Sequence, residues 1–74
     1  MREYIVIFEP GVASWSAYVP DVPDVPGCIA AAETRTETER LIRETLVLHL
    51  RAMAADGEPI PEPSGQAQVI AVAV

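Results

Sequence analysis

The chain has 74 residues and a mass of 8.0 kDa, half of its residues are apolar, and its formal net charge is −6. This length allows one domain only, so we expect a single domain over residues 1–74 with no separate DNA-binding domain. Domains this small often need a disulfide, a metal or a partner chain. One cysteine and one histidine exclude an internal disulfide and a soft zinc-ligand set within one chain. Oligomerisation is the remaining support, and we expect a homodimer or a higher homo-oligomer.

The charge and the first residues restrict the partners and the location. Eleven acidic residues against five arginines repel a phosphate backbone, so we expect no direct nucleic-acid binding and favour a basic partner. The N-terminal apolar run is five residues long and ends at Glu9 and Pro10 without a cleavage site for a signal peptide. No stretch is long enough to span a membrane. We therefore expect a cytoplasmic protein without membrane contact.

Three short segments have the patterns of β-strands. Residues 2–9 are apolar on both faces around a β-branched centre, which predicts a covered strand. After a turn at Pro10 and Gly11, residues 14–19 alternate, which predicts a second, antiparallel strand. Its two faces are Trp15, Ala17 and Val19 on one side, and Ser14, Ser16 and Tyr18 on the other. The apolar residues 28–32 predict a third strand.

The next segment predicts a helix over residues 36–56. Thr36 with Glu39, or Thr34 with Glu37, has the spacing of a capping box, and either start is acceptable. Apolar residues then recur at steps of three and four. Gly57 can close the helix in a left-handed conformation, and Pro59 prevents its continuation.

The last residues complete the predicted fold. Residues 58–63 have a proline at every second position, which is typical of an extended connector. Residues 69–74 are apolar on both faces and predict a fourth strand, parallel to the first. The fold class is therefore α+β with two layers: a β-β-β-α-β chain, a four-stranded sheet in the order 3-2-1-4, and one helix on one face. The other face or edge then needs a cover.

Several motifs together resemble the N-terminal domain of the HicB antitoxin family. They are "PDVPGC" at residues 23–28, "LHL" at 48–50 and "DGEPIP" at 56–61, in this order and spacing. The resemblance covers nearly the whole chain and implies a pared-down ribonuclease H-like fold. It also implies a partner, a HicA-type toxin, which is a small RNA-cleaving protein. The Pro-Asp step occurs twice in this chain, at Asp21 and Asp24, and Asp24 is the better match because Gly27 and Cys28 follow it closely.

The proline run at residues 19–27 is a candidate partner-binding site. Prolines at every third position suit a polyproline II segment, which places Asp21 and Asp24 on one side. The run is either a stiff solvated connector or a rigid acidic projection that meets a basic toxin. Pro26 and Gly27 suit the central positions of a type II turn and so have a structural role.

Two aromatic residues are further candidates for partner binding. Trp15 and Tyr18 point to opposite faces of one strand, so one packs under the helix and the other is free for a partner; the sequence leaves open which. His49 is expected to lie at the border of the core without a catalytic role, and Cys28 is expected to be a buried, inert thiol. Because no carboxylates converge, we expect no catalytic residues, no metal and no cofactor, and hence no enzyme.

Two classes of function fit these patterns. The first is an antitoxin that binds and neutralises a HicA-type RNA-cleaving toxin in a type II toxin-antitoxin system. The second is a solitary HicB-like homo-oligomeric scaffold or regulatory module without a toxin. A neighbouring reading frame for a small basic protein favours the first.

Overall fold

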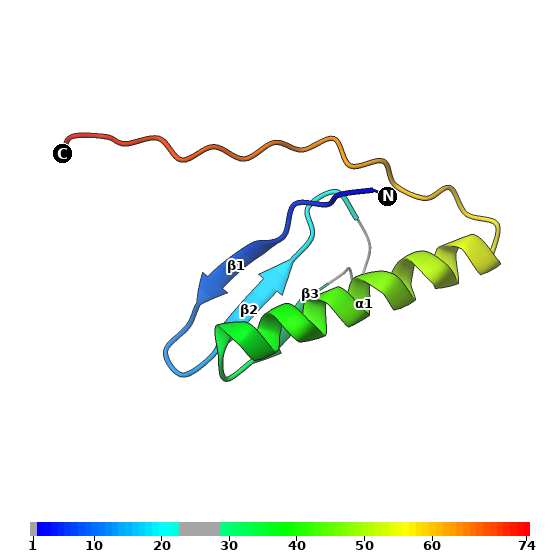
Figure 1. The fold of residues 1–74 in the computed structure, drawn as a ribbon, viewed down its shortest axis with the longest axis horizontal. Coiled ribbons are helices and arrows are strands. Elements are labelled where there is room, and N and C mark those ends of the chain that lie inside the picture. Colours follow the sequence, from blue (N-terminus) through cyan, green and yellow to red (C-terminus); the bar gives the residue numbers. More distant parts are fainter. Residues whose placement is uncertain (1, 23–28) are drawn as a thin grey trace.

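The computed structural model describes residues 2–22 and 29–74. Three strands, β1 (Ile7–Pro10), β2 (Trp15–Tyr18) and β3 (Ile29–Ala32), precede a helix, α1 (Arg35–Ala55). The strands form an antiparallel sheet with β2 in the middle. The helix crosses one face of this sheet, over β3 and β2 (Figure 1). The predicted turn at Pro26 and Gly27 lies outside the described residues.

The register of the strands gives the sheet two different faces. Phe8, Ala17 and Ala30 are aligned across the strands, and all three belong to the core, with Ala17 only 2% exposed. Since side chains alternate along a strand, their neighbours Ile7, Tyr18 and Ile29 are aligned on the opposite face. The helix covers the first face and leaves the second open. The alternation predicted for residues 14–19 is confirmed by this burial.

The core lies between the helix and the sheet. Ala17, Val19, Val22 and Ile42 are buried. Partly buried apolar side chains from the N-terminal segment and from α1 pack against them: Tyr4, Val6, Phe8, Ala30, Leu46 and Leu50. Burial of this small set supplies the hydrophobic stabilisation of the two layers.

Both ends of α1 have specific caps. The Thr34 hydroxyl accepts a hydrogen bond from the Glu37 backbone N–H at 3.1 Å, so the helix uses the earlier of the two predicted starts. At the other end, Gly57 has a φ of +74°. The Gly57 N–H bonds to the Ala54 carbonyl at 3.1 Å and the Glu58 N–H to the Met53 carbonyl at 2.9 Å. This pair of bonds is a Schellman motif, which explains the glycine.

The predicted four-stranded sheet with the order 3-2-1-4 is wrong. The described residues contain three strands, and residues 66–74, here called the tail, run on as an extended segment that pairs with none of them (Figure 1). Val69 is 97% exposed and Val72 is 72% exposed. The strand prediction rested on the apolar composition of both faces of this segment. Such a strand is stable only where both faces are covered, and the only helix of the described residues lies over β2 and β3.

Candidate interaction surface

Three apolar side chains form a row across the uncovered face of the sheet. Ile7, Tyr18 and Ile29, here called the outer-face row, come one each from β1, β2 and β3 and are aligned by the strand register. Tyr18 is 39% exposed and Ile29 is 61% exposed. A shallow hollow beside them is lined by Ser16, Tyr18, Ile29 and Ala31. An exposed aromatic next to an apolar hollow is a common anchor point for a protein partner.

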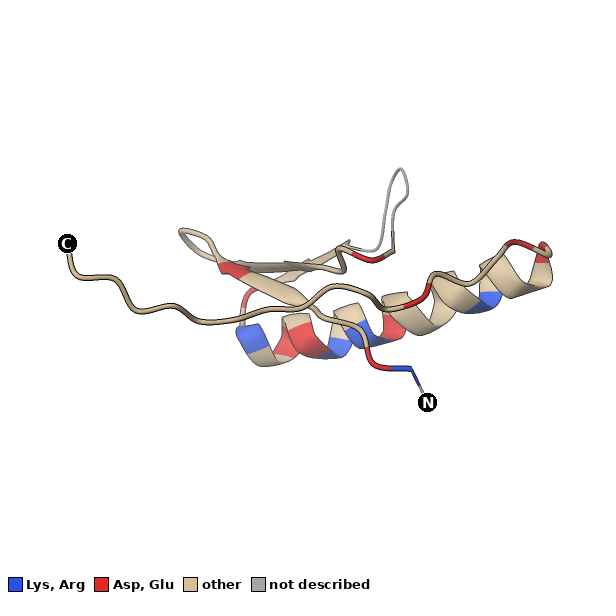
Figure 2. Cartoon of the chain, turned by 90° about the horizontal axis from the view of Figure 1, so that it is seen from above, with Lys and Arg blue, Asp and Glu red and all other residues tan. Residues whose placement is uncertain are grey.

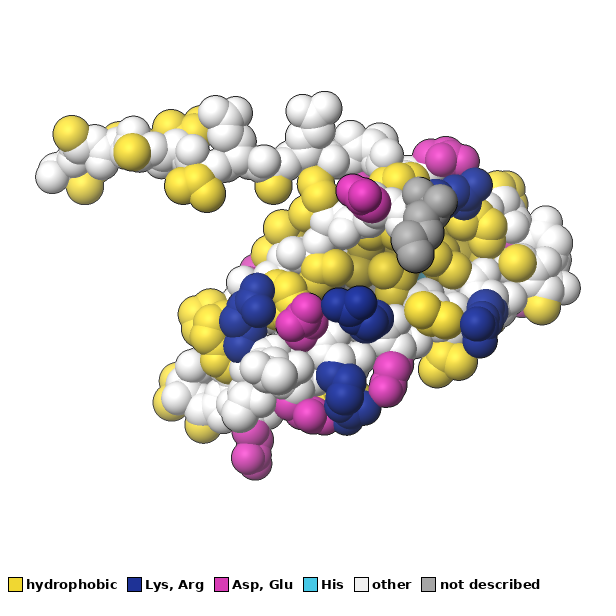
Figure 3. All heavy atoms as spheres, in the orientation of Figure 1, with side chains coloured by type: hydrophobic (Ala, Val, Ile, Leu, Met, Phe, Trp, Pro, Cys, Tyr) yellow, Lys and Arg dark blue, Asp and Glu magenta, His cyan; other side chains and the backbone are white. Residues whose placement is uncertain are grey.

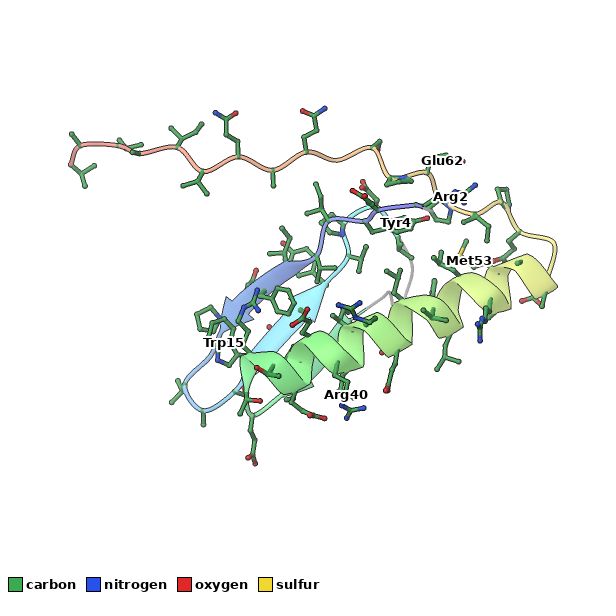
Figure 4. The ribbon with its side chains drawn as sticks, in the orientation of Figure 1. Arg2, Tyr4, Trp15, Arg40, Met53 and Glu62 are labelled. Carbon is green, nitrogen blue, oxygen red and sulfur yellow. The ribbon has the colours of Figure 1, made fainter. Side chains whose placement is uncertain are left out.

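Trp15 and Tyr18 lie on opposite faces of β2. Trp15 shares the helix-facing side with Ala17, and its carbonyl accepts a hydrogen bond from the Thr38 hydroxyl of α1 at 3.3 Å. Figure 4 shows Trp15 at the end of the sheet near the start of the helix. The alternative left open by the sequence is therefore resolved: Trp15 is on the covered face, and Tyr18 is on the face free for a partner.

Asp21 contacts the C-terminal segment of the chain. Its Oδ2 atom accepts hydrogen bonds from the backbone N–H groups of Ser64 at 3.2 Å and of Gly65 at 3.0 Å. A Cβ atom on residue 65 would lie 3.2 Å from the same oxygen, so glycine allows this close approach. The carboxylate thus joins the end of β2 to a segment more than 40 positions later in the chain. Asp24, Pro26 and Gly27 lie outside the described residues.

Two further contacts hold the same C-terminal segment. The Tyr4 hydroxyl donates a hydrogen bond to the Pro61 carbonyl, and Arg2 forms an ion pair with Glu62 at 3.0 Å. Figure 4 shows Arg2, Tyr4 and Glu62 gathered where this segment passes the N-terminal residues. Together with Asp21, these contacts fix residues 61–65 against the body of the protein, and the tail begins directly after them.

The charges on α1 are largely paired with one another. Arg40 bonds to Glu37 through Nε at 3.1 Å and to Glu44 through Nη1 at 2.8 Å, and Arg43 bonds to Glu39 at 3.2 Å. The hydrogen bond from Arg40 holds the pKa of Glu37 below its ordinary value, and the same contact raises the pKa of Arg40. Figure 2 shows these alternating charges along the helix. The helix therefore presents a neutralised stripe.

Three acidic side chains outside α1 have no such partner. Within residues 2–22 and 29–74, Glu9, Glu33 and Glu58 form no ion pair. Glu9 is on the uncovered face of the sheet, aligned with Ser16 and Ala31 in the row next to the outer-face row. Negative charge thus borders the apolar patch, which suits a partner with a basic rim.

The described residues form neither a metal-binding cluster nor a membrane-spanning helix. Among them no group of three or more His, Cys, Asp or Glu side chains could hold a metal ion. The described part of the chain also contains no helix that is long and apolar enough to cross a membrane. His49 is half-buried on α1, and Cys28 lies outside the described residues.

Comparison with known proteins decides the family. A family profile described as "HicB-like antitoxin of bacterial toxin-antitoxin system" matches residues 4–73, which is nearly the whole chain. The chain belongs to this HicB-like antitoxin family.

One curated relative also matches this HicB-like chain. It comes from Haemophilus phage HP1 (strain HP1c1) and is described as an uncharacterized 14.9 kDa protein in the rep-hol intergenic region. It is 38% identical over 53 residues, which cover 72% of this chain and 40% of the relative. The chain therefore spans less than half the length of the curated relative it matches. No solved structure gives a significant match.

The outer-face row contains two residues that the sequence reasoning did not select. Ile7 and Ile29 were assigned only to strands, and their alignment with Tyr18 depends on the register between strands. Two antiparallel hairpins and strict alternation would have been enough to find the row, had the turn lengths been known. Cross-strand alignment is therefore the signal that was missed.

Proposed function

We propose that this chain is an antitoxin that binds and neutralises a HicA-type RNA-cleaving toxin, and that it is itself no enzyme. The observation that carries this proposal is the match of the HicB-like antitoxin family over residues 4–73. The net charge of −6 supports it, because an RNA-cleaving protein needs a basic surface for the phosphate backbone. An acidic protein on that surface competes directly with RNA.

The outer-face row is the surface that we assign to the toxin. It combines an exposed aromatic, Tyr18, with the exposed Ile29 and with Glu9 in the neighbouring row. A surface with an apolar centre and an acidic border is expected for an interface with a basic protein. No DNA-binding domain is needed for this role, so repression of transcription is not part of the proposal.

The test requires a small basic protein encoded next to the gene of this chain, and the absence of such a neighbour would itself count against the antitoxin assignment. The two proteins are co-expressed and purified by size-exclusion chromatography at low salt, and cleavage of a reporter RNA by the neighbour is measured with and without the chain. We expect co-elution and loss of cleavage. Separate elution with unchanged cleavage would exclude the antitoxin assignment and favour a scaffold that associates only with itself.

A matched pair of variants tests the surface. Tyr18→Arg places a bulky cation in the outer-face row, whereas Val12→Arg places the same side chain in the β1–β2 turn, where Val12 is fully exposed. We expect Tyr18→Arg to raise the Kd for the toxin by at least roughly tenfold, and Val12→Arg to leave it within about twofold. Equal effects of both variants would show that the toxin binds elsewhere.

The acidic projection predicted from the proline run is tested separately. Charge reversal at Asp24 should slow association with the toxin and leave dissociation nearly unchanged, if this carboxylate steers the encounter. The same change at Asp21 also removes the acceptor of the Ser64 and Gly65 amides, so its effect includes release of the C-terminal segment. An unchanged association rate for Asp24→Lys would remove the projection from the interface.

A further inference from the structure

The tail has an apolar composition, but its side chains are exposed to solvent. Residues 66–74 contain no charge, and the last six are β-branched or alanine. Alternate positions give one face of Ile70, Val72 and Val74 and another of Val69, Ala71 and Ala73. Yet these side chains are in water: Val69 is 97% exposed, Ile70 is 71% exposed and Val72 is 72% exposed. Figure 3 shows hydrophobic side chains along a thin arm that extends beyond the body.

The arm also makes the molecule less compact than its length requires. The radius of gyration is 13.9 Å, and the longest dimension, 48 Å, is well above the other two at 27 and 23 Å. A compact domain of this length has a radius of gyration of roughly 11 Å. A neutral, apolar segment rich in β-branched residues favours the β-strand conformation, but here it has no neighbouring strand to pair with among the described residues.

The sheet has a free edge at which a further strand such as the tail can pair. β1 is an edge strand, because the order of strands is β1-β2-β3. Pro10 at its end has no N–H, so pairing along this edge would run back over Ile7 and the extended residues before it. The tail can reach along this whole edge, since nine extended residues span about 30 Å.

A hollow beside the β1 edge can receive the side chains of an added strand. The helix packs over β3 and β2, and on the β1 side it leaves a hollow of about 330 Å³. Its walls are mostly apolar and come from the N-terminal segment, β1 and α1: Tyr4, Val6, Phe8, Ile42 and Leu46, with the ion-paired Glu39 and Arg43 of α1 also lining it. A strand added to β1 directs every second side chain toward this hollow, and the face of Ile70, Val72 and Val74 has the bulk to occupy it.

The contacts before the tail favour a second copy as the source of that strand. Residues 61–65 are tied down by Tyr4, Arg2 and Asp21, and from there the tail leads away from its own β1. Each molecule therefore carries an extended strand and an edge that lacks one. Two molecules related by a twofold axis satisfy both edges at once and close the assembly.

We infer that two copies of this chain exchange their tails, each tail pairing with the β1 edge of the other copy. The exchange gives the dimer two strands that neither monomer places in its own sheet. It leaves both outer-face rows accessible, so it is independent of the proposed toxin interface and can hold if that proposal fails. A proline-bounded connector before the tail, with prolines at 59, 61 and 63, suits such an exchange because it stays extended.

The decisive experiment is isotope-filtered NMR on an equal mixture of labelled and unlabelled full-length chains. We expect NOEs between the Val72 methyl groups of one copy and the Val6 methyl groups of the other, since both face the hollow, in a species of dimer mass by light scattering. NOEs within one copy only would overturn the exchange, because the tail would then belong to its own sheet. A monomer, or a dimer without contacts between these residues, would overturn it as well.

A pair of variants tests the pairing energetically. Ala71→Pro removes a backbone N–H from the middle of the tail but keeps its apolar character, whereas Ala71→Ser keeps the N–H and adds only a hydroxyl. We expect Ala71→Pro to raise the dimer Kd by at least roughly tenfold, and Ala71→Ser to change it less than about threefold. Sedimentation equilibrium measures both. Successive N–H groups of an edge strand point alternately to its neighbour and to solvent, so Val72→Pro is measured as well, and unchanged Kd values for both proline variants would contradict the exchange.

Discussion

At the scale of single residues, Asp21 links two distant parts of the chain that share no strand pairing. Its carboxylate accepts two backbone N–H groups, those of Ser64 and Gly65. Carboxylate acceptors make stronger hydrogen bonds than neutral ones. The contact therefore decides where the C-terminal segment stops following the body of the protein and where the tail begins.

Removal of this acceptor should release the segment. In Asp21→Ala we expect the amide hydrogens of Ser64 and Gly65 to exchange at least roughly tenfold faster, because a hydrogen bond to a charged group contributes about 1.5–3 kcal/mol. Hydrogen exchange followed by NMR measures this. Glu58→Ala is the control, since the Glu58 side chain has no partner among the described residues. Unchanged exchange at both amides would show that the contact is not populated in solution.

Arg40 sets the titration of a neighbouring carboxylate. Its hydrogen bond, with a smaller contribution from its charge, lowers the pKa of Glu37. A depressed pKa means that the pair stabilises the folded state above the pKa of the unfolded chain, and that this contribution disappears as the pH falls through the pKa of the folded state. In Arg40→Ala the pKa of Glu37 should rise toward its ordinary value, as measured by NMR titration. In the control Arg43→Ala, which breaks the Glu39 pair instead, it should stay depressed.

At the scale of elements, Ile42 is the buried apolar side chain of α1 that packs against the sheet. Ile42 is 2% exposed and belongs to the buried core with Ala17, Val19 and Val22. Truncation to alanine should cost about 2–5 kcal/mol of the free energy of unfolding. The whole stability of a chain this short is only about 4–11 kcal/mol, so Ile42→Ala should be partly unfolded at 37 °C. Urea unfolding followed by circular dichroism measures the loss.

Val47 provides the comparison within the same helix. It is 43% exposed, so Val47→Ala should cost less than about 1 kcal/mol. If both truncations had equal effects, the helix would not pack on the sheet through the Ile42 face. A smaller m-value in Ile42→Ala would further indicate that its native state is loosened.

The elements also differ in how far the sequence determines them. The helix could be predicted to within one residue at each end because its signals are local: a threonine and a glutamate three positions apart at one end, and a glycine followed by a proline at the other. The faces of β2 followed from alternation alone. The fourth strand was mispredicted because pairing depends on a neighbour far away in the chain, and an apolar sequence does not specify which edge covers it.

In the candidate site, too, local sequence predicts some features, and contacts with distant residues determine the others. Tyr18 could be selected from its place on β2, but its accessibility depends on which side of the sheet the helix covers. Asp21 was selected for its charge, whereas its bonds to Ser64 and Gly65 depend on the path of a segment more than 40 residues away. Residue types predicted candidates, and tertiary structure decided their surroundings.

At the scale of the whole molecule, the layers leave two surfaces for other chains. One helix covers one face of a three-stranded sheet, which exposes the outer-face row on the opposite side and the β1 edge at the margin. These surfaces are different in kind. The face offers side chains and a bordering negative charge, and the edge offers backbone groups and an apolar hollow. The proposed toxin interface and the proposed tail exchange therefore use different surfaces and are compatible with each other.

The net charge of the whole molecule predicts how the association with the proposed toxin depends on salt. With a charge of −6 and several carboxylates that have no ion-pair partner, the chain attracts a basic protein over about 10 Å at 0.1 M ionic strength. Raising the salt concentration from 50 to 500 mM should therefore lower the association rate constant at least roughly tenfold. The dissociation rate should change much less, because it depends mainly on the apolar contacts around Tyr18. Stopped-flow mixing of the two proteins measures both rates. An association rate that is independent of salt would mean that shape and apolar contact, without electrostatic attraction, bring the two proteins together.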